Sequence, residues 1–191
     1  MSGQHKTGND SLCLISGNSH KFDELRSVIR NLVQVNIDLP EVQGVDSRDV
    51  ISAKLTEARK HFSKGAILVE DTALHLLCLK GFPGALIKWL LSSVGGKGIY
   101  DLCEKLGNFE ATARTVLGYL PEGTDAPLFF DDTLDGIICP PKGANGFGWD
   151  PIFIPHGFSK SLAEMDESEL QAIKMRRKAA DKLVKHLALQ S

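Results

Sequence analysis

This sequence lacks the marks of membrane, secreted and nucleic-acid-wrapping proteins. No apolar run approaches the ~20 residues that span a bilayer, and residues 1–11 have no apolar centre like that of a signal peptide. Neither sign of charge dominates, because 22 Lys and Arg residues face 24 Asp and Glu residues, which argues against a protein that wraps a nucleic-acid backbone. We therefore expect a cytoplasmic protein with no membrane or nucleic-acid partner.

The four cysteines show neither a zinc-site nor a disulfide spacing. They are widely separated and include no Cys-x-x-Cys pair: Cys13, Cys78, Cys103 and Cys139. Small disulfide frameworks and zinc sites need closer, patterned cysteines, so we expect four reduced thiols. A chain of 191 residues with 42% hydrophobic content can bury a core without such cross-links.

The first half of the chain alternates between strand and helix patterns. Residues 1–11 are polar and aperiodic, which predicts a disordered tail, and residues 12–191 are expected to form a single domain. Short apolar runs predict strands at 12–16, 33–37 and 66–69, and apolar periodicity predicts helices at 21–32 and 49–62. Strand-helix units in this order favour an α/β fold with a sheet that is at least partly parallel.

The second half begins with two helices and then changes character. Helices are expected at 85–94 and 98–106, separated by Gly95 and Gly96. Stretches of β-prone residues at 111–120, 126–130 and 134–138, broken by a turn and by an aspartate pair, predict an antiparallel meander. A loop at 140–151, a short strand at 152–154 and a long helix at 167–187 complete the chain.

One candidate anion site lies where the first strand meets the first helix. A helix N-terminus offers free backbone N–H groups and the positive end of the helix dipole, and Lys21 adds a cation there. The spacing is not that of a Walker A loop, and plain helix capping is the alternative interpretation. The candidate phosphate-binding residues are Ser16, Gly17, Asn18, Ser19, His20 and Lys21.

Two adjacent acids follow the strand at 66–69, where α/β folds place ligands. Consecutive strand residues point to opposite faces, so only one of Glu70 and Asp71 can aim at a metal ion, unless both are simply solvated. Glu41 supplies a third acid, and Mg²⁺ prefers a few carboxylates with water and phosphate oxygens. Together with three lysines (Lys21, Lys54 and Lys88), these acids predict a site for a triphosphate and a metal ion.

A loop near the end of the chain places two aromatic rings among glycines. Phe147 and Trp149 flank Gly148 and precede Asp150. A ring in such a loop can stack on a base while a carboxylate reads its edge, although aromatic residues beside glycine also serve as core plugs.

Seven stretches, in this order, resemble the inosine triphosphate pyrophosphatase family: ISGNSHK, IDLPEVQG, ISAK, LVEDTAL, GFPGALIKW, GFGWDPIF and LAEM. They span most of the chain from Leu12 to Ala180, and IDLPEVQG and IKW look like the eukaryotic branch. The resemblance implies an elongated two-lobed α/β fold with a mixed sheet and a central cleft, usually as a homodimer. It also implies hydrolysis of ITP, dITP and XTP to the monophosphate and pyrophosphate.

The resemblance also implies a role for each candidate. Glu41 and Asp71 would hold Mg²⁺, with Mn²⁺ as the alternative ion. The water-orienting role is our own expectation from the chemistry of hydrolysis, and its candidates are Asp71 and Glu70. The triphosphate would lie near residues 16–21 and three further side chains, Lys54, Thr72 and Lys88. The base would stack near Phe147 and Trp149, with Gly148 and Asp150 beside them. Met175 and Arg176 are further candidate substrate-binding residues.

The last helix departs from the family pattern. The family has a lysine and then Ser-His-Arg, whereas the aligned residues here are Leu170 and then Lys174, Met175 and Arg176. Lys174 is a possible substitute donor, unless the register of the helix slips. Base selectivity therefore stays open, and so do two alternatives: a pyrophosphatase for other modified nucleotides, and a catalytically silent nucleotide-binding module.

Overall fold

The computed structural model describes residues 11–40 and 42–190 and contains a seven-stranded mixed sheet. The strand order is β2-β1-β3-β5-β6-β7, with β4 beside β3. β1 (Leu12–Ile15) pairs in parallel with β2 (Leu32–Val35) and with the start of β3 (Ala66–Leu76). The remaining pairs are antiparallel and involve β4 (Pro83–Gly84), β5 (Glu110–Leu120), β6 (Leu128–Ile138) and β7 (Phe153–Pro155). The predicted mixed α/β sheet is confirmed.

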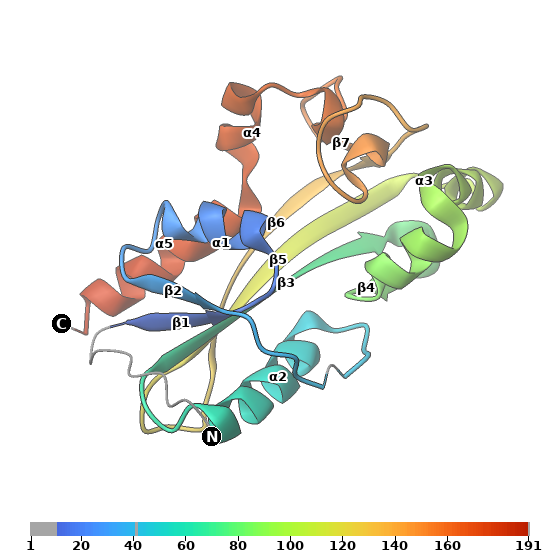
Figure 1. The fold of residues 1–191 in the computed structure, drawn as a ribbon. Coiled ribbons are helices and arrows are strands. Elements are labelled where there is room, and N and C mark those ends of the chain that lie inside the picture. The colour runs from blue at the N-terminus through green and yellow to red at the C-terminus, as the bar shows by residue number, and fades with distance from the viewer. Residues whose placement is uncertain (1–10, 41, 191) are drawn as a thin grey trace.

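Helices cover both faces of the sheet (Figure 1). α1 (Ser19–Arg26) and α5 (Met175–Ala188) lie on one face, and α2 (Ser47–His61) lies on the other. α3 (Ile87–Lys105) covers the far end of the sheet. A short helix, α4 (Glu167–Ile173), and three 3-10 turns complete the set: η1 (Leu77–Leu79), η2 (Asp150–Ile152) and η3 (Leu162–Glu164).

Strand alternation divides the apolar residues among three cores. Leu68 packs with α1 and α5, whereas its neighbour Val69 packs with α2, because successive strand residues face opposite sides. A third core beneath α3 contains Leu74 and Phe153. The first two cores belong to one lobe and the third to the other lobe, so β3 and β5 run through both lobes.

Four predicted element boundaries were wrong. The strand predicted at 66–69 extends to Leu76, and the two strands predicted at 126–130 and 134–138 are one strand, β6. α1 ends at Arg26 instead of continuing through residue 32. The long terminal helix is interrupted at Lys174, whose ψ of 99° is not helical.

The remaining observations at this level concern a helix break, the cysteines, membrane spans and the N-terminal tail. Gly95 has φ 70° and ψ 172° and breaks α3, as the glycine pair predicted. All four cysteines are free thiols. Among the residues with described positions, no helix is long and apolar enough to cross a bilayer. The predicted tail lies outside the described residues, except for Ser11.

Candidate functional site

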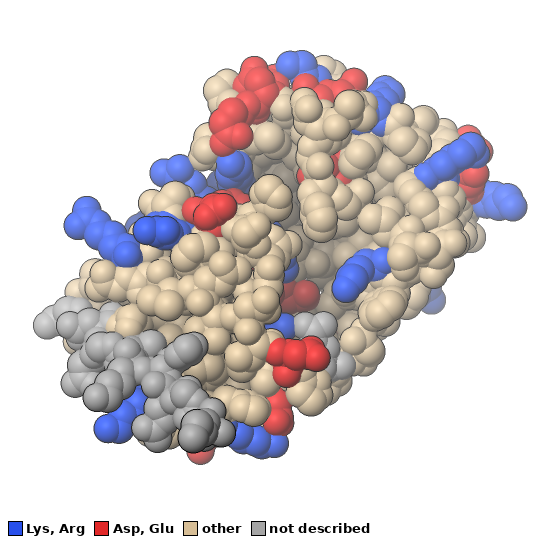
Figure 2. All heavy atoms as spheres, in the orientation of Figure 1, with Lys and Arg blue, Asp and Glu red and all other residues tan. Residues whose placement is uncertain are grey.

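The candidate site lies at an opening in the sheet beside β3. β1 pairs with β3 as far as Leu68, and β4 pairs with β3 from Leu74. Within the described part of the chain, no strand therefore pairs with that edge of β3 over residues 69–73. Figure 2 shows the surface hollowed between the two lobes, with acidic and basic side chains inside the hollow. Glu70, Asp71 and Thr72 lie on this stretch, in the middle of β3 and not at its end as predicted.

The two adjacent acids point to opposite faces, as the strand alternation predicted. Glu70 faces α1 and α5, because its carboxylate contacts Lys21 Nζ at 2.6 Å and Arg176 Nε at 3.2 Å. Asp71 faces α2, because Ser47 Oγ donates a hydrogen bond to its Oδ2 at 2.5 Å. The two acids beside the opening therefore lie on opposite faces of the sheet.

Glu70 is a fully buried carboxylate, since its side chain has 0% exposed area. Burial acts to raise its pKa, but the charges of Lys21 and Arg176, with hydrogen bonds from Lys21 and Thr72, lower the pKa to about 2. The Thr72 hydroxyl donates to Glu70 Oε1 at 2.6 Å. Glu70 therefore stays ionised across the physiological range and orients two cations toward the opening.

The turn before α1 uses its polar side chains to build the helix N-terminus. The side-chain oxygen of Asn18 accepts the Lys21 N–H at 3.2 Å, and Ser16 Oγ accepts the Asn18 N–H at 3.1 Å. Ser19 and His20 are exposed on the first turn. A Cβ at Gly17 would lie 3.0 Å from Asn36 Oδ1, which leaves little room there for a side chain. Helix capping is therefore observed, and phosphate binding by this turn stays a prediction.

Arg176 joins three elements at the same place. From the first turn of α5 it pairs with Glu24 on α1 and with Glu70, and its Nη2 lies 3.4 Å from Thr72 Oγ1. Burial acts to lower the pKa of Arg176, but the carboxylates of Glu70 and Glu24 raise it. The sequence predicted Arg176 but not Glu24, because a glutamate on the polar side of a short helix looks like any solvated residue. Thr115, 3.0 Å from Thr72 Oγ1, was also missed.

The predicted metal pair is only partly described. Asp71 is half-buried at the opening, whereas Glu41 lies outside the described residues. Lys54 is half-buried on α2, on the face of the sheet that Asp71 points to. The described residues contain no group of three or more His, Cys, Asp and Glu side chains able to hold a metal. A single hard carboxylate beside a ligand cleft nonetheless fits Mg²⁺, which keeps several waters and binds substrate phosphates.

The aromatic loop is folded around the carboxylate of Asp150. Phe147 N–H donates to Asp150 Oδ2 at 2.6 Å. Burial raises the pKa of Asp150, while this hydrogen bond and the charge of Arg176 oppose the rise. Gly146 has φ 88°, and a Cβ there would lie 2.7 Å from Asp150 Oδ2, so only glycine fits. The loop is therefore held in one shape beside Arg176.

The two rings of this loop have different surroundings. Phe147 is 75% exposed, which leaves its face free for a ligand. Trp149 meets the Phe153 ring edge-on, with centroids 5.4 Å apart, and packs on the third core, as Met175 does. Lys174, the possible substitute donor, pairs with Glu167 at 2.7 Å. Of the two sequence interpretations, base stacking remains open to Phe147, and core packing describes much of Trp149.

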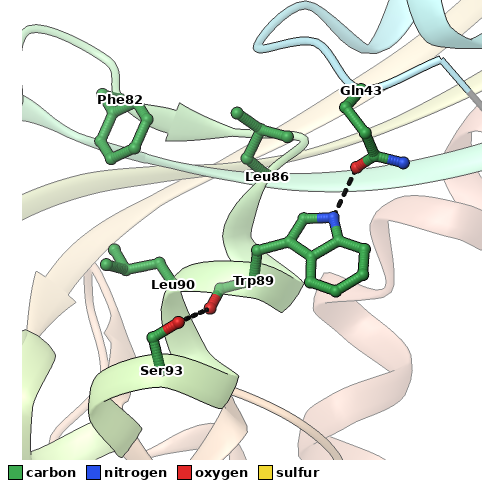
Figure 3. A pocket seen from close by; sticks show the side chains of 6 residues that line it. All are labelled: Gln43, Phe82, Leu86, Trp89, Leu90 and Ser93. Carbon is green, nitrogen blue, oxygen red and sulfur yellow. Dashed lines mark hydrogen bonds between the residues drawn. The ribbon is translucent and has the colours of Figure 1, made fainter.

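Lys88 lies at the start of α3, on the other side of the opening. It is exposed, and its Nζ is 5.4 Å from the centroid of the Trp89 ring. The Trp89 indole N–H donates to Gln43 Oε1 at 2.5 Å (Figure 3). Gln43 was not identified from the sequence, because an exposed glutamine in a loop has no distinctive pattern.

Comparison with known proteins gives consistent matches over nearly the whole chain. The Ham1 family model matches residues 12–186. The inosine triphosphate pyrophosphatase of Schizosaccharomyces pombe is 37% identical over 177 residues, covering 91% of this chain and 93% of that protein. The inosine triphosphate pyrophosphatase of Yarrowia lipolytica is 37% identical over 182 residues, covering 93% of this chain and 96% of that protein.

Solved structures show the same architecture. A HAM1 protein from Coxiella burnetii superposes with a TM-score of 0.81 at 23% identity, covering 95% of this chain and 99% of that one. A nucleoside-triphosphatase described as a dITP/XTP pyrophosphatase, from Mycobacterium abscessus, superposes with a TM-score of 0.72 at 25% identity. That match covers 91% of this chain and 98% of the other chain.

Proposed function

Because this chain belongs to the Ham1 family, we propose that it hydrolyses non-standard purine nucleoside triphosphates (ITP, dITP and XTP) to the monophosphate and pyrophosphate. Relatives named inosine triphosphate pyrophosphatase, at 37% identity over about nine-tenths of the chain, support this activity. The observation that carries the proposal is the convergence of Glu70, Asp71, Lys21 and Arg176 at one opening of the sheet. The activity would remove damaged nucleotides from the nucleotide pool.

The cationic side chains are suited to hold the triphosphate. Lys21 Nζ is directed by Glu70, and its side chain remains 24% exposed, so it can also donate to a phosphate oxygen. Lys88 lies across the opening and Lys54 on the Asp71 side. A polyanion needs such charge neutralisation before water can attack it. Mg²⁺, with Mn²⁺ as the alternative, would be held by Asp71 and Glu41, and when bound it offsets charge on the phosphate oxygens.

Asp71 is the better of the two candidates for orienting the attacking water. A carboxylate with a pKa of about 2, engaged by two cations, is a weak base, so Glu70 is better suited to positioning Lys21 and Arg176. Asp71 accepts a hydrogen bond from the neutral hydroxyl of Ser47. It is half-buried at the opening. In this assignment Ser47 fixes the carboxylate, and Asp71 accepts a hydrogen bond from the water.

Phe147 offers an exposed face for the base. Its N–H donates to Asp150, and the charge of Arg176 acts on that carboxylate. A site whose polar groups go unpaired with the wrong base discriminates strongly. We extend the proposal to a homodimer, which rests on the family resemblance alone, and to the cytoplasm, the compartment expected from the sequence. Light scattering that gives the mass of one chain would remove the dimer from it.

A pyrophosphate-release assay tests the activity. ITP, dITP, XTP, dUTP, GTP and ATP are compared with and without Mg²⁺, and we expect rapid, metal-dependent release from ITP, dITP and XTP and little from ATP. A preference for dUTP would favour the pyrophosphatase for other modified nucleotides. Nucleotide binding without release from any of the six would favour the silent module.

The variant Asp71→Asn tests the site. We expect kcat to fall at least about 100-fold, in line with the usual contribution of a catalytic carboxylate, while the melting temperature stays near the wild-type value. Asp101→Asn is the matched control, because Asp101 is engaged by Lys97 on the exposed side of α3. Near-normal turnover by Asp71→Asn would remove the proposed site even if the wild-type protein is active.

A further inference from the structure

One loop segment connects the two sides of the opening. Residues 42–46, here called the crossing segment, lead into Ser47, the residue that donates to Asp71. The segment packs on the start of the second lobe, because Ala85 N–H donates to Val45 O at 3.0 Å. Gly84 has φ 59°, and a Cβ there would lie 2.3 Å from Val45 O. A side chain at residue 84 would therefore prevent this close approach between the main chains of Gly84 and Val45.

The crossing segment makes a second contact with this lobe through Trp89. The Trp89 indole N–H donates to Gln43 Oε1 (Figure 3). The ammonium of Lys88 lies over the Trp89 ring, 5.4 Å from its centroid. Trp89 is 53% exposed, so packing alone does not fix its ring. The ring and Gln43 border a cavity of about 400 Å³, together with Phe82, Leu86, Leu90 and Ser93. The hydrogen bond thus selects one orientation for a ring that would otherwise have freedom to turn.

We propose that Gln43 and Trp89 are positioning residues that hold Lys88 at the triphosphate. The inference rests on the proposed function. A continuous set of contacts runs from Asp71 through Ser47 and the crossing segment to Trp89, and from its ring to Lys88. Cation–π attraction is significant at such distances, so the orientation of the ring biases where the ammonium lies. Gln43 and Trp89 thereby set the position of a cation on one lobe relative to a carboxylate on the other.

Two single substitutions separate the parts of this device. Trp89→Phe keeps an aromatic face for Lys88 but removes the N–H donor, and Gln43→Met keeps the side-chain length but removes the acceptor. Loss of one neutral hydrogen bond corresponds to a factor of about three to ten. We expect each variant to raise the KM for dITP by that factor. Because Lys88 would contact the phosphates before and during reaction, kcat should stay within about twofold.

Combined variants test whether the effect passes through Lys88. The double variant Gln43→Met/Trp89→Phe should have the same KM as either single variant, since each substitution removes the same hydrogen bond. In a Lys88→Met background, Trp89→Phe should change KM no further. Ser93→Ala is the matched control, because Ser93 borders the same cavity but its hydroxyl donates to Trp89 O within α3. This control should keep the wild-type KM, and melting temperatures should agree among all variants within about 2 °C.

A measurement without turnover completes the test. The chain has only two tryptophans, so its ¹H–¹⁵N spectrum contains two indole signals, and Gln43→Met should shift the one that Trp89→Phe removes. A wild-type KM in either single variant, independent multiplication of the two effects, or an undiminished effect in the Lys88→Met background would overturn the inference while leaving the proposed function intact. A wild-type protein inactive on every nucleotide would instead overturn the proposed function, and the inference with it.

Discussion

A single buried carboxylate organises the charged side chains at the opening. Glu70 contacts Lys21 and Arg176 and accepts from Thr72, and Arg176 in turn pairs with Glu24. Removing one partner of such a group leaves an uncompensated buried charge, which is far more destabilising than the net value of the pair. The same residue therefore supports both the stability of the fold and the geometry of the site.

This arrangement predicts a pH-dependent contribution to stability. The folded pKa of Glu70, about 2, lies below its usual value of 4.5, so the stabilisation is fully present above pH 4.5 and is lost as the pH falls toward 2. We expect Glu70→Gln to lower the free energy of unfolding by about 3 kcal/mol at pH 7. The difference from wild type should close between pH 4.5 and 2.

Urea unfolding at several pH values checks this prediction. Glu122→Gln, at an exposed turn, serves as the control and should differ from wild type by less than about 0.5 kcal/mol at every pH. A difference for Glu70→Gln that does not change between pH 7 and pH 3 would show that its carboxylate is not held in the ionised form.

For individual residues, the sequence predicted which side chains lie at the opening better than it predicted the residues that contact them. Four residues were identified from motifs, and all four lie at one opening: Glu70, Asp71, Lys21 and Arg176. Ser47, Glu24 and Gln43 were missed because each acts through one contact with a residue distant in sequence. Such contacts depend on how the helices dock, and no local pattern encodes that docking.

Most elements were predicted correctly from their periodicity, and two of the wrong boundaries lie at acidic pairs. The acidic pair at 70–71 was expected to end β3, yet the strand continues because Lys21, Arg176 and Ser47 satisfy both carboxylates. The pair at 131–132 was expected to divide β6. It lies within the strand because Arg114 pairs with Asp131 at 2.7 Å and Lys182 pairs with Asp132 at 2.9 Å.

One arginine joins the C-terminus of α2 to the turn before β3 and to the end of β5. The Arg59 guanidinium donates to four backbone carbonyls that follow α2 or lie at the end of β5: Phe62, Gly65, Leu120 and Pro121. A lysine at this position cannot present the same fork of donors. We expect Arg59→Lys to lower the free energy of unfolding by about 2 kcal/mol, seen as a lower urea midpoint with an unchanged slope.

The control for this prediction is Arg30→Lys at an exposed position after α1, which should change the stability by less than about 0.5 kcal/mol. Because Arg59 lies at the opposite end of α2 from Ser47, the KM of Arg59→Lys should equal that of wild type. Wild-type stability in Arg59→Lys would mean that the four carbonyls are equally well satisfied by water.

For the whole molecule, long strands that run through both lobes make the lobes interdependent. β3 supplies Leu68 to the first core, Val69 to the second and Leu74 to the third. β5 contributes to the same three cores through other residues: Leu117, Val116 and Ala113. Neither lobe therefore has a core that is complete without the strands that it shares with the other lobe.

We expect a single cooperative unfolding transition. Trp89 and Trp149 both belong to the second lobe, so tryptophan fluorescence reports on that lobe, whereas far-ultraviolet circular dichroism reports on all helices. The two signals should give the same urea midpoint. Separate midpoints would show that the lobes unfold independently despite their shared strands.

The open stretch of β3 at residues 69–73 gives a molecule bound there a wall made partly of peptide groups. Every residue has a backbone C=O acceptor, and every residue except proline has a backbone N–H donor. A compound that forms hydrogen bonds with these backbone groups would therefore keep those bonds after most point mutations. A compound that binds only the Lys21 or Arg176 side chain would lose its contacts after a single substitution.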